Sequence, residues 1–76
     1  MRARIVQVLA DVFKRPADAF GEDTSPATVA GWDSTRHVEL VVALEDRFAC
    51  MFEPEDVAEL VTLSKIEEIL TRHGCQ

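Results

Sequence analysis

Residues 32–48 read Trp32-Asp33-Ser34-Thr35-Arg36-His37-Val38-Glu39-Leu40-Val41-Val42-Ala43-Leu44-Glu45-Asp46-Arg47-Phe48, and this stretch determines the expected fold. Asp33 and Ser34 favour a helix start, because their side-chain oxygens accept hydrogen bonds from backbone N–H groups that lack a helical partner. The following residues recur at i, i+3, i+4, i+7 and i+11, the spacing of a helix face turned to a core. This expected core stripe consists of His37, Leu40, Val41, Leu44 and Phe48, with His37 as its polar end rather than a catalyst.

Upstream of this helix we expect a first helix and a long loop. The first helix has an apolar face of Ile5, Val8, Leu9 and Val12. Pro16 should end that helix near Arg15, because a residue before proline disfavours the helical conformation. Residues 15–33 are rich in turn and cap residues, and so long a loop in a small domain must be held against the core. The expected anchors are Phe20, Val29 and Trp32.

Downstream, two further helices are expected. Pro54 fits the first position of a short third helix, with Glu55 and Asp56 favourable in its first turn. The inward residues of this helix should be Val57 and either Leu60 or Val61. Ser64 and Glu67 form the Ser-x-x-Glu pattern of a capping box at the start of a fourth helix. That helix has a core stripe of Leu63, Ile66, Ile69 and Leu70, and His73-Gly74 should stop it.

No segment shows the alternation of a strand, so the predicted fold is all-α. We expect a small four-helix bundle with three longer helices, a short third helix and a long loop between helices one and two. The 76 residues should form a single domain, residues 1–76. A chain of this size buries roughly 60% of its unfolded surface, which leaves little room for a deep catalytic cleft. The short length of the chain therefore favours a carrier or an interaction module over an enzyme.

The charge balance indicates which partners to expect. Fourteen acidic and eight basic residues give a net charge of −6, which counts against nucleic-acid binding because that requires basic patches. An acidic domain suits partners with basic docking surfaces, since complementary charge speeds encounter.

The cysteines and histidines show no recognisable site. Cys50 and Cys75 lack metal or redox spacing, and we expect two free thiols in a reducing compartment, although one disulfide is conceivable. His37 and His73 have no cysteine or carboxylate cluster around them at the spacing of metal ligands.

No apolar run approaches the roughly 20 residues of a membrane span. The start Met1-Arg2-Ala3-Arg4 superficially resembles a signal peptide. Gln7 and Asp11 interrupt the apolar stretch that follows, so it is better interpreted as an amphipathic helix. We therefore expect a cytoplasmic protein.

The segment Gly31-Trp32-Asp33-Ser34, followed by Leu40, Leu44-Glu45 and Phe48, resembles the attachment region of acyl carrier proteins, which belong to the phosphopantetheine-binding carrier family. Residues 52–60 together with Thr62-Leu63 are similar to the second half of that family, so the resemblance runs from Ile5 to Leu70. Two positions depart from the family pattern. Thr35 stands where the family most often has Leu, and Ala49 stands where relatives often turn with Gly or Asp.

The resemblance implies a non-catalytic carrier. A phosphopantetheinyl transferase would attach 4′-phosphopantetheine from coenzyme A to Ser34, and Asp33 would lie near the metal of that transferase. The arm would hold acyl or aminoacyl groups as thioesters for the acyl-loading and acyl-processing enzymes of fatty acid or polyketide biosynthesis. Small apolar cargo could fold back between helices two and three, against Val42 and Val57.

In such carriers the second helix is the usual recognition helix, so we interpret its outer face as a docking strip for partners. The docking strip consists of Thr35, Val38, Glu39, Val42, Glu45 and Asp46. A solvated face with scattered valines is the simpler interpretation of the same residues.

Two other functions are compatible with parts of this sequence. An unmodified acidic helical interaction module would keep the same fold and the same acidic face. An enzyme with a serine nucleophile would need a base and an orienting acid, and His37 and His73 are poorly placed for that. We expect a free-standing monomer, because the chain starts with Met1 and has a short tail after Leu70.

Overall fold

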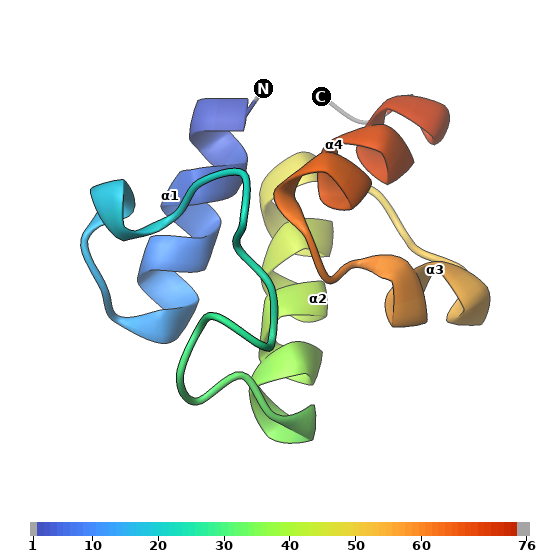
Figure 1. The fold of residues 1–76 in the computed structure, drawn as a ribbon. Helices are drawn as coiled ribbons and strands as arrows, with labels where there is room; N and C mark the ends of the chain where they lie inside the picture. The colour runs from blue at the N-terminus through green and yellow to red at the C-terminus, as the bar shows by residue number, and fades with distance from the viewer. Residues whose placement is uncertain (1, 75–76) are drawn as a thin grey trace.

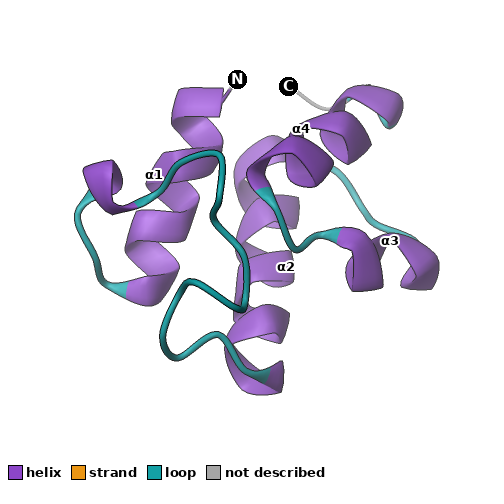
Figure 2. Cartoon of the chain, viewed as in Figure 1, coloured by secondary structure: helices purple, strands orange, loops and turns teal. Residues whose placement is uncertain are grey.

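The computed structural model describes residues 2–74, which form four α-helices and one short 3-10 turn (Figures 1 and 2). The elements are, in chain order, α1 (Arg2–Phe13), η1 (Ala17–Ala19), α2 (Ser34–Phe48), α3 (Pro54–Glu59) and α4 (Leu63–Arg72). The predicted all-α architecture is confirmed, including the short third helix and the long loop between the first two helices.

The helix α2 stands at the centre of the bundle, between α1 on one side and the α3–α4 pair on the other (Figure 1). Helix α1 packs chiefly against α2 and also contacts α4, while α3 contacts α4. The long loop crosses the outside of α1 and α2 before it enters α2 (Figure 2). This arrangement leaves the N-terminus of α2 at one end of the bundle, with the loop and α3 beside it.

The core contains the expected stripes of α2 and α4. The buried residues of these two helices are Leu40, Val41, Leu44, Phe48, Leu63, Ile66, Ile69 and Leu70. His37 is half-buried at the end of the α2 stripe, as predicted. The three expected anchors of the long loop, Phe20, Val29 and Trp32, are also buried.

Helix α1 differs from the prediction at its C-terminal end. It stops at Phe13, two residues before Arg15, because Lys14 adopts a left-handed conformation with φ 56°. The Arg15 N–H then bonds the carbonyl of Ala10 at 3.1 Å, which is the Schellman pattern of a helix terminus. Phe13 is buried in place of Val12, which is only partly buried, because the long loop covers that face of α1. Pro16 therefore follows a helix that has already ended.

The start of α4 also differs from the prediction. Thr62, not Ser64, is the N-cap residue, and its hydroxyl accepts a hydrogen bond from the backbone N–H of Lys65 at 3.1 Å. The predicted capping box of Ser64 and Glu67 is therefore wrong, because the helix already begins at Leu63 and Ser64 lies within its first turn. The predicted stop is confirmed, with His73 as the C-cap and Gly74 at φ 69°.

Helix α3 begins at Pro54, as predicted, and Leu60 rather than Val61 is the fully buried residue that follows it. Val57 is partly buried against the core. Asp56 lies in the first turn of α3, as predicted, and is only 5% exposed. Its carboxylate accepts hydrogen bonds from the backbone N–H of Glu53 at 3.1 Å and from His73 Nε2 at 2.7 Å. The pair Asp56–His73 thus ties the start of α3 to the end of α4.

Candidate functional site

The N-terminus of α2 has the geometry that the sequence predicts. Asp33 is the N-cap in an extended conformation, and its Oδ1 accepts a hydrogen bond from the backbone N–H of Arg36 at 2.9 Å. Ser34 is the first residue of the helix and is exposed. Gly31, with φ 88°, provides the left-handed turn that leads into this cap. The hydroxyl of Ser34 is therefore presented to solvent at the positive end of the helix dipole.

Trp32 holds this end of α2 against α1. Its indole is 5.1 Å from the ring of Phe13, centroid to centroid, with 46° between the planes, and the residue is only 9% exposed. The prediction that Trp32 anchors the loop against the core is therefore confirmed.

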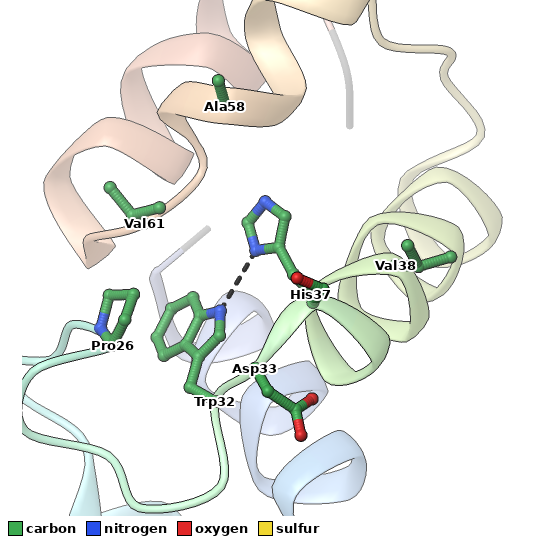
Figure 3. A pocket seen from close by; sticks show the side chains of 8 residues that line it. Pro26, Trp32, Asp33, His37, Val38, Ala58 and Val61 are labelled. Carbon is green, nitrogen blue, oxygen red and sulfur yellow. Dashed lines mark hydrogen bonds between the residues drawn. The ribbon is translucent and has the colours of Figure 1, made fainter.

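His37 connects Trp32 to α3. The indole N–H of Trp32 donates to His37 Nδ1 at 3.0 Å (Figure 3). His37 Nε2 lies 2.6 Å from the backbone oxygen of Val57. Because Nδ1 accepts, Nε2 carries the proton and donates to Val57, so the ring is assigned as the neutral tautomer. Both nitrogens are thus engaged away from Ser34, which is not the arrangement of a nucleophile and its base.

An open cavity of about 510 Å³ lies beside Ser34, and we call it the Ser34 hollow. It is lined by Pro26, Trp32, Asp33, Ser34, His37, Val38, Ala58 and Val61 (Figure 3). Its walls come from the long loop, the first turns of α2, and α3 with the residues after it. No sequence pattern indicated Pro26 or Ala58, and Val61 was expected only as an alternative inward residue to Leu60, because all three become part of the site only through packing.

The expectation that cargo would contact Val42 and Val57 does not match this cavity, since neither residue lines it. The ring of His37 occupies the space between α2 and α3 at this level, and the side chain of Val57 packs against the core. Val42 lies one turn farther along α2 than Val38 and is 58% exposed. The cavity therefore opens at the end of α2, not between the middles of the two helices.

The outer face of α2 presents most of the docking strip to solvent. Thr35, Val38, Glu39, Val42 and Asp46 are exposed. Val38 is 60% exposed and Val42 is 58% exposed, so two apolar side chains lie at the surface of α2 among the acidic residues.

Two carboxylates of the docking strip also interact within the chain. Glu39 pairs with Arg36 at 2.7 Å on the surface of α2. Glu45 is half-buried, and its Oε2 accepts a hydrogen bond from the backbone N–H of Phe52 at 3.0 Å. Glu45 therefore holds the loop after α2, and its carboxylate is less available to a partner than those of Glu39 and Asp46.

A second cluster, which no sequence pattern indicates, lies at the N-terminal end of α3. The ring of His73 meets the edge of Phe52 at 5.9 Å in a T-shaped contact, while its Nε2 bonds Asp56. This hydrogen bond, with that from the Glu53 backbone, lowers the pKa of Asp56 below the usual carboxyl value. The cluster fixes α3 at its N-terminal end, while His37 fixes it near Val57.

Across residues 2–74, no helix has both the length and the apolar character needed to cross a membrane. Within the same part of the chain, no three His, Cys, Asp or Glu side chains gather as a metal site would require. Cys75 lies outside the described residues, so the state of the two cysteine thiols stays a prediction.

Comparison with known proteins agrees with this geometry. The family described as "Phosphopantetheine attachment site" matches residues 3–70. An acyl carrier protein from an Exiguobacterium species is 34% identical over 67 residues, which cover 79% of this chain and 85% of that protein. The chain therefore belongs to the phosphopantetheine-binding carrier family, whose members are non-catalytic and receive phosphopantetheine from a transferase.

Proposed function

We propose that Ser34 carries the phosphopantetheine arm and that the chain presents acyl or aminoacyl groups to partner enzymes. The observation that supports this most directly is the position of Ser34, which is exposed, begins α2 and lines the edge of the Ser34 hollow. A phosphodiester at this point would be stabilised by the helix dipole and by backbone N–H groups of the first turn. When attached, the arm supplies a thiol that holds cargo as a thioester.

The other serines are less suited to modification. Ser25 is half-buried, and its Oγ accepts a hydrogen bond from the backbone N–H of Ala27 at 3.2 Å. Ser64 lies in the first turn of α4 and does not line the hollow. Asp33 supports Ser34 by capping α2, and we propose that its carboxylate lies near the transferase metal during attachment.

The outer face of α2 is our proposed surface for the transferase and for acyl-loading and acyl-processing enzymes. Val38 and Val42 offer apolar contact area, and Glu39 and Asp46 offer charge for a basic partner surface. Thr35, exposed beside Ser34, offers a smaller and more polar contact than the Leu that is usual in the family. Fatty acid and polyketide biosynthesis are the pathways we propose, and the cytoplasmic location stays a prediction.

Mass spectrometry tests the assignment of Ser34. Incubation of the chain with coenzyme A and a promiscuous phosphopantetheinyl transferase should add one phosphopantetheine per chain. Ser34→Ala should abolish the addition, whereas Ser25→Ala and Ser64→Ala should leave it intact. Modification that persists in Ser34→Ala would overturn the assignment. A folded wild-type chain that no transferase modifies would favour the unmodified interaction module instead.

A further inference from the structure

Two adjacent cations, Lys14 and Arg15, follow the last residue of α1, and we call them the basic end of α1. Both are exposed, and among the described residues neither forms an ion pair. The Arg15 guanidinium donates a hydrogen bond to the carbonyl of Ala30 at 3.2 Å, and this neutral acceptor leaves the positive charge in place.

Several other cations of the chain are neutralised by carboxylates. Those that form ion pairs within the described residues are Arg2, Arg36, Arg47 and Lys65. Asp11, one turn before Lys14 on α1, is bonded to Arg47 at 2.7 Å and does not compensate the basic end. The basic end of α1 is therefore a local positive patch on a chain whose net charge is −6.

This positive patch lies beside the attachment end of the bundle. The end of α1 and the start of α2 point toward the same end of the molecule (Figure 1), and the rings of Phe13 and Trp32 hold them together at 5.1 Å. Arg15 reaches Ala30, which precedes Ser34 by four residues, a span of at most roughly 14 Å when extended. A protein that covers Ser34 therefore also approaches the basic end of α1.

The surface around Ser34 thus carries charges of both signs. Glu39 and Asp46 lie on the docking strip of α2, whereas Lys14 and Arg15 lie at the end of α1. A uniformly basic partner would be attracted by the strip and repelled by the basic end. Charge complementarity therefore favours a partner whose surface also carries both signs.

We propose that the transferase that loads Ser34 presents an acidic patch to Lys14 and Arg15, in addition to the basic surface that faces the docking strip. The inference rests on the proposed attachment at Ser34 and adds the charge pattern of the partner. Two contacts of opposite sign fix the orientation of the chain on the enzyme, because a rotated chain would bring like charges together.

Charge reversal tests the proposal through the sign of its effect. The transferase with the highest kcat/KM for this chain would be chosen from a panel, and modification would be followed by mass at low salt and saturating coenzyme A. Lys14→Glu with Arg15→Glu makes an acidic chain more acidic, so a uniformly basic partner would modify it faster. An acidic patch would repel it, and kcat/KM should fall by roughly three- to tenfold.

Matched variants separate the charge from the structure. Lys14→Glu alone keeps the bond between Arg15 and Ala30 and should still slow modification. Arg72→Glu makes the same charge change at the C-terminal end of α4, toward the opposite end of the bundle (Figure 1), and should not slow it. At 1 M salt the Debye length is about 3 Å, so the loss should disappear there, whereas a loss caused by a displaced loop would persist.

Several results would overturn the proposal. They are an unchanged or higher kcat/KM in the double variant at low salt, an equal loss in Arg72→Glu, and a loss that persists at 1 M salt. A rise in the KM for coenzyme A, with the KM for the chain unchanged, would mean that Lys14 and Arg15 act on the coenzyme and not on the enzyme surface. Failure of the wild type to gain any mass would be seen before these comparisons, and would overturn the proposed function itself.

Discussion

Ala49 provides a test of the backbone geometry that ends α2. It lies at φ 52°, ψ 49°, in the left-handed region, and is exposed. The backbone N–H of Cys50 bonds the carbonyl of Glu45 at 3.1 Å, which closes the helix in a Schellman pattern. The left-handed conformation raises the free energy of the folded state by about 1–2 kcal/mol for a residue with a Cβ, but not for glycine.

Ala49→Gly should therefore stabilise the chain. Part of this gain is lost, because glycine has more conformational freedom than alanine in the unfolded state. That freedom lowers the free energy of unfolding by roughly 0.4–1 kcal/mol. The difference between these terms predicts a gain of roughly 0.5–1 kcal/mol in the free energy of unfolding. For a domain of this size the melting temperature should rise by about 3–6 °C.

Urea titration and thermal melting, both followed by far-ultraviolet circular dichroism, would measure this change. Ala43→Gly is the matched control, because it makes the same chemical change in the regular interior of α2. It should lower the free energy of unfolding by roughly 1 kcal/mol. Destabilisation by Ala49→Gly of similar size to that by Ala43→Gly would refute the reasoning, since it would mean that Ala49 bears no left-handed penalty.

Three other variants, one of them a double substitution, test the core, the α3 contact and the docking strip. Phe48 is 2% exposed, and Phe48→Ala should cost roughly 3–5 kcal/mol, about what a core of this size supplies, so the chain should be largely unfolded at room temperature. A cooperative melt close to that of the wild type would contradict this. The lowered pKa of Asp56 contributes stability that is present above about pH 4, the ordinary carboxyl value, and that is lost as pH falls through the lower folded value. The stability advantage of the wild type over Asp56→Asn in urea titrations should therefore shrink on acidification, and an advantage that is constant with pH would argue against the contribution. Reversal of Glu39 and Asp46 to Lys should slow modification by the transferase at low salt and weaken the salt dependence of its rate. An unchanged rate at low salt would mean that these acids do not steer the partner.

Several features of the chain follow from its sequence alone. Helical periodicity identified the buried faces of α2 and α4, because a helix repeats its contacts every three to four residues whatever surrounds it. Asp33, Pro54 and Gly74 marked helix ends correctly, since capping depends on the side chain and backbone of one or two residues. The same local chemistry predicts that Ser34 lies at the start of a helix, where α2 begins.

Other features depend on packing between distant segments. Helix α1 ends at Phe13, where Lys14 turns left-handed, and the rings of Phe20 and Trp32 pack on Phe13; no local pattern indicates those contacts. Helix α4 begins at Leu63 with Thr62 as its N-cap, and not at the Ser-x-x-Glu pattern of Ser64 and Glu67.

The tertiary structure also decided the character of the site. The spacing of His37 placed it at the end of a core stripe, but only the fold brings Trp32 and the Val57 carbonyl to its two nitrogens. Pro26, Ala58 and Val61 form the walls of the Ser34 hollow although they lie in two segments far apart in the chain. A sequence pattern records which residues a helix turns inward, because that depends on local geometry. It does not record which residues of different segments meet, because that depends on how the helices and the loop pack together.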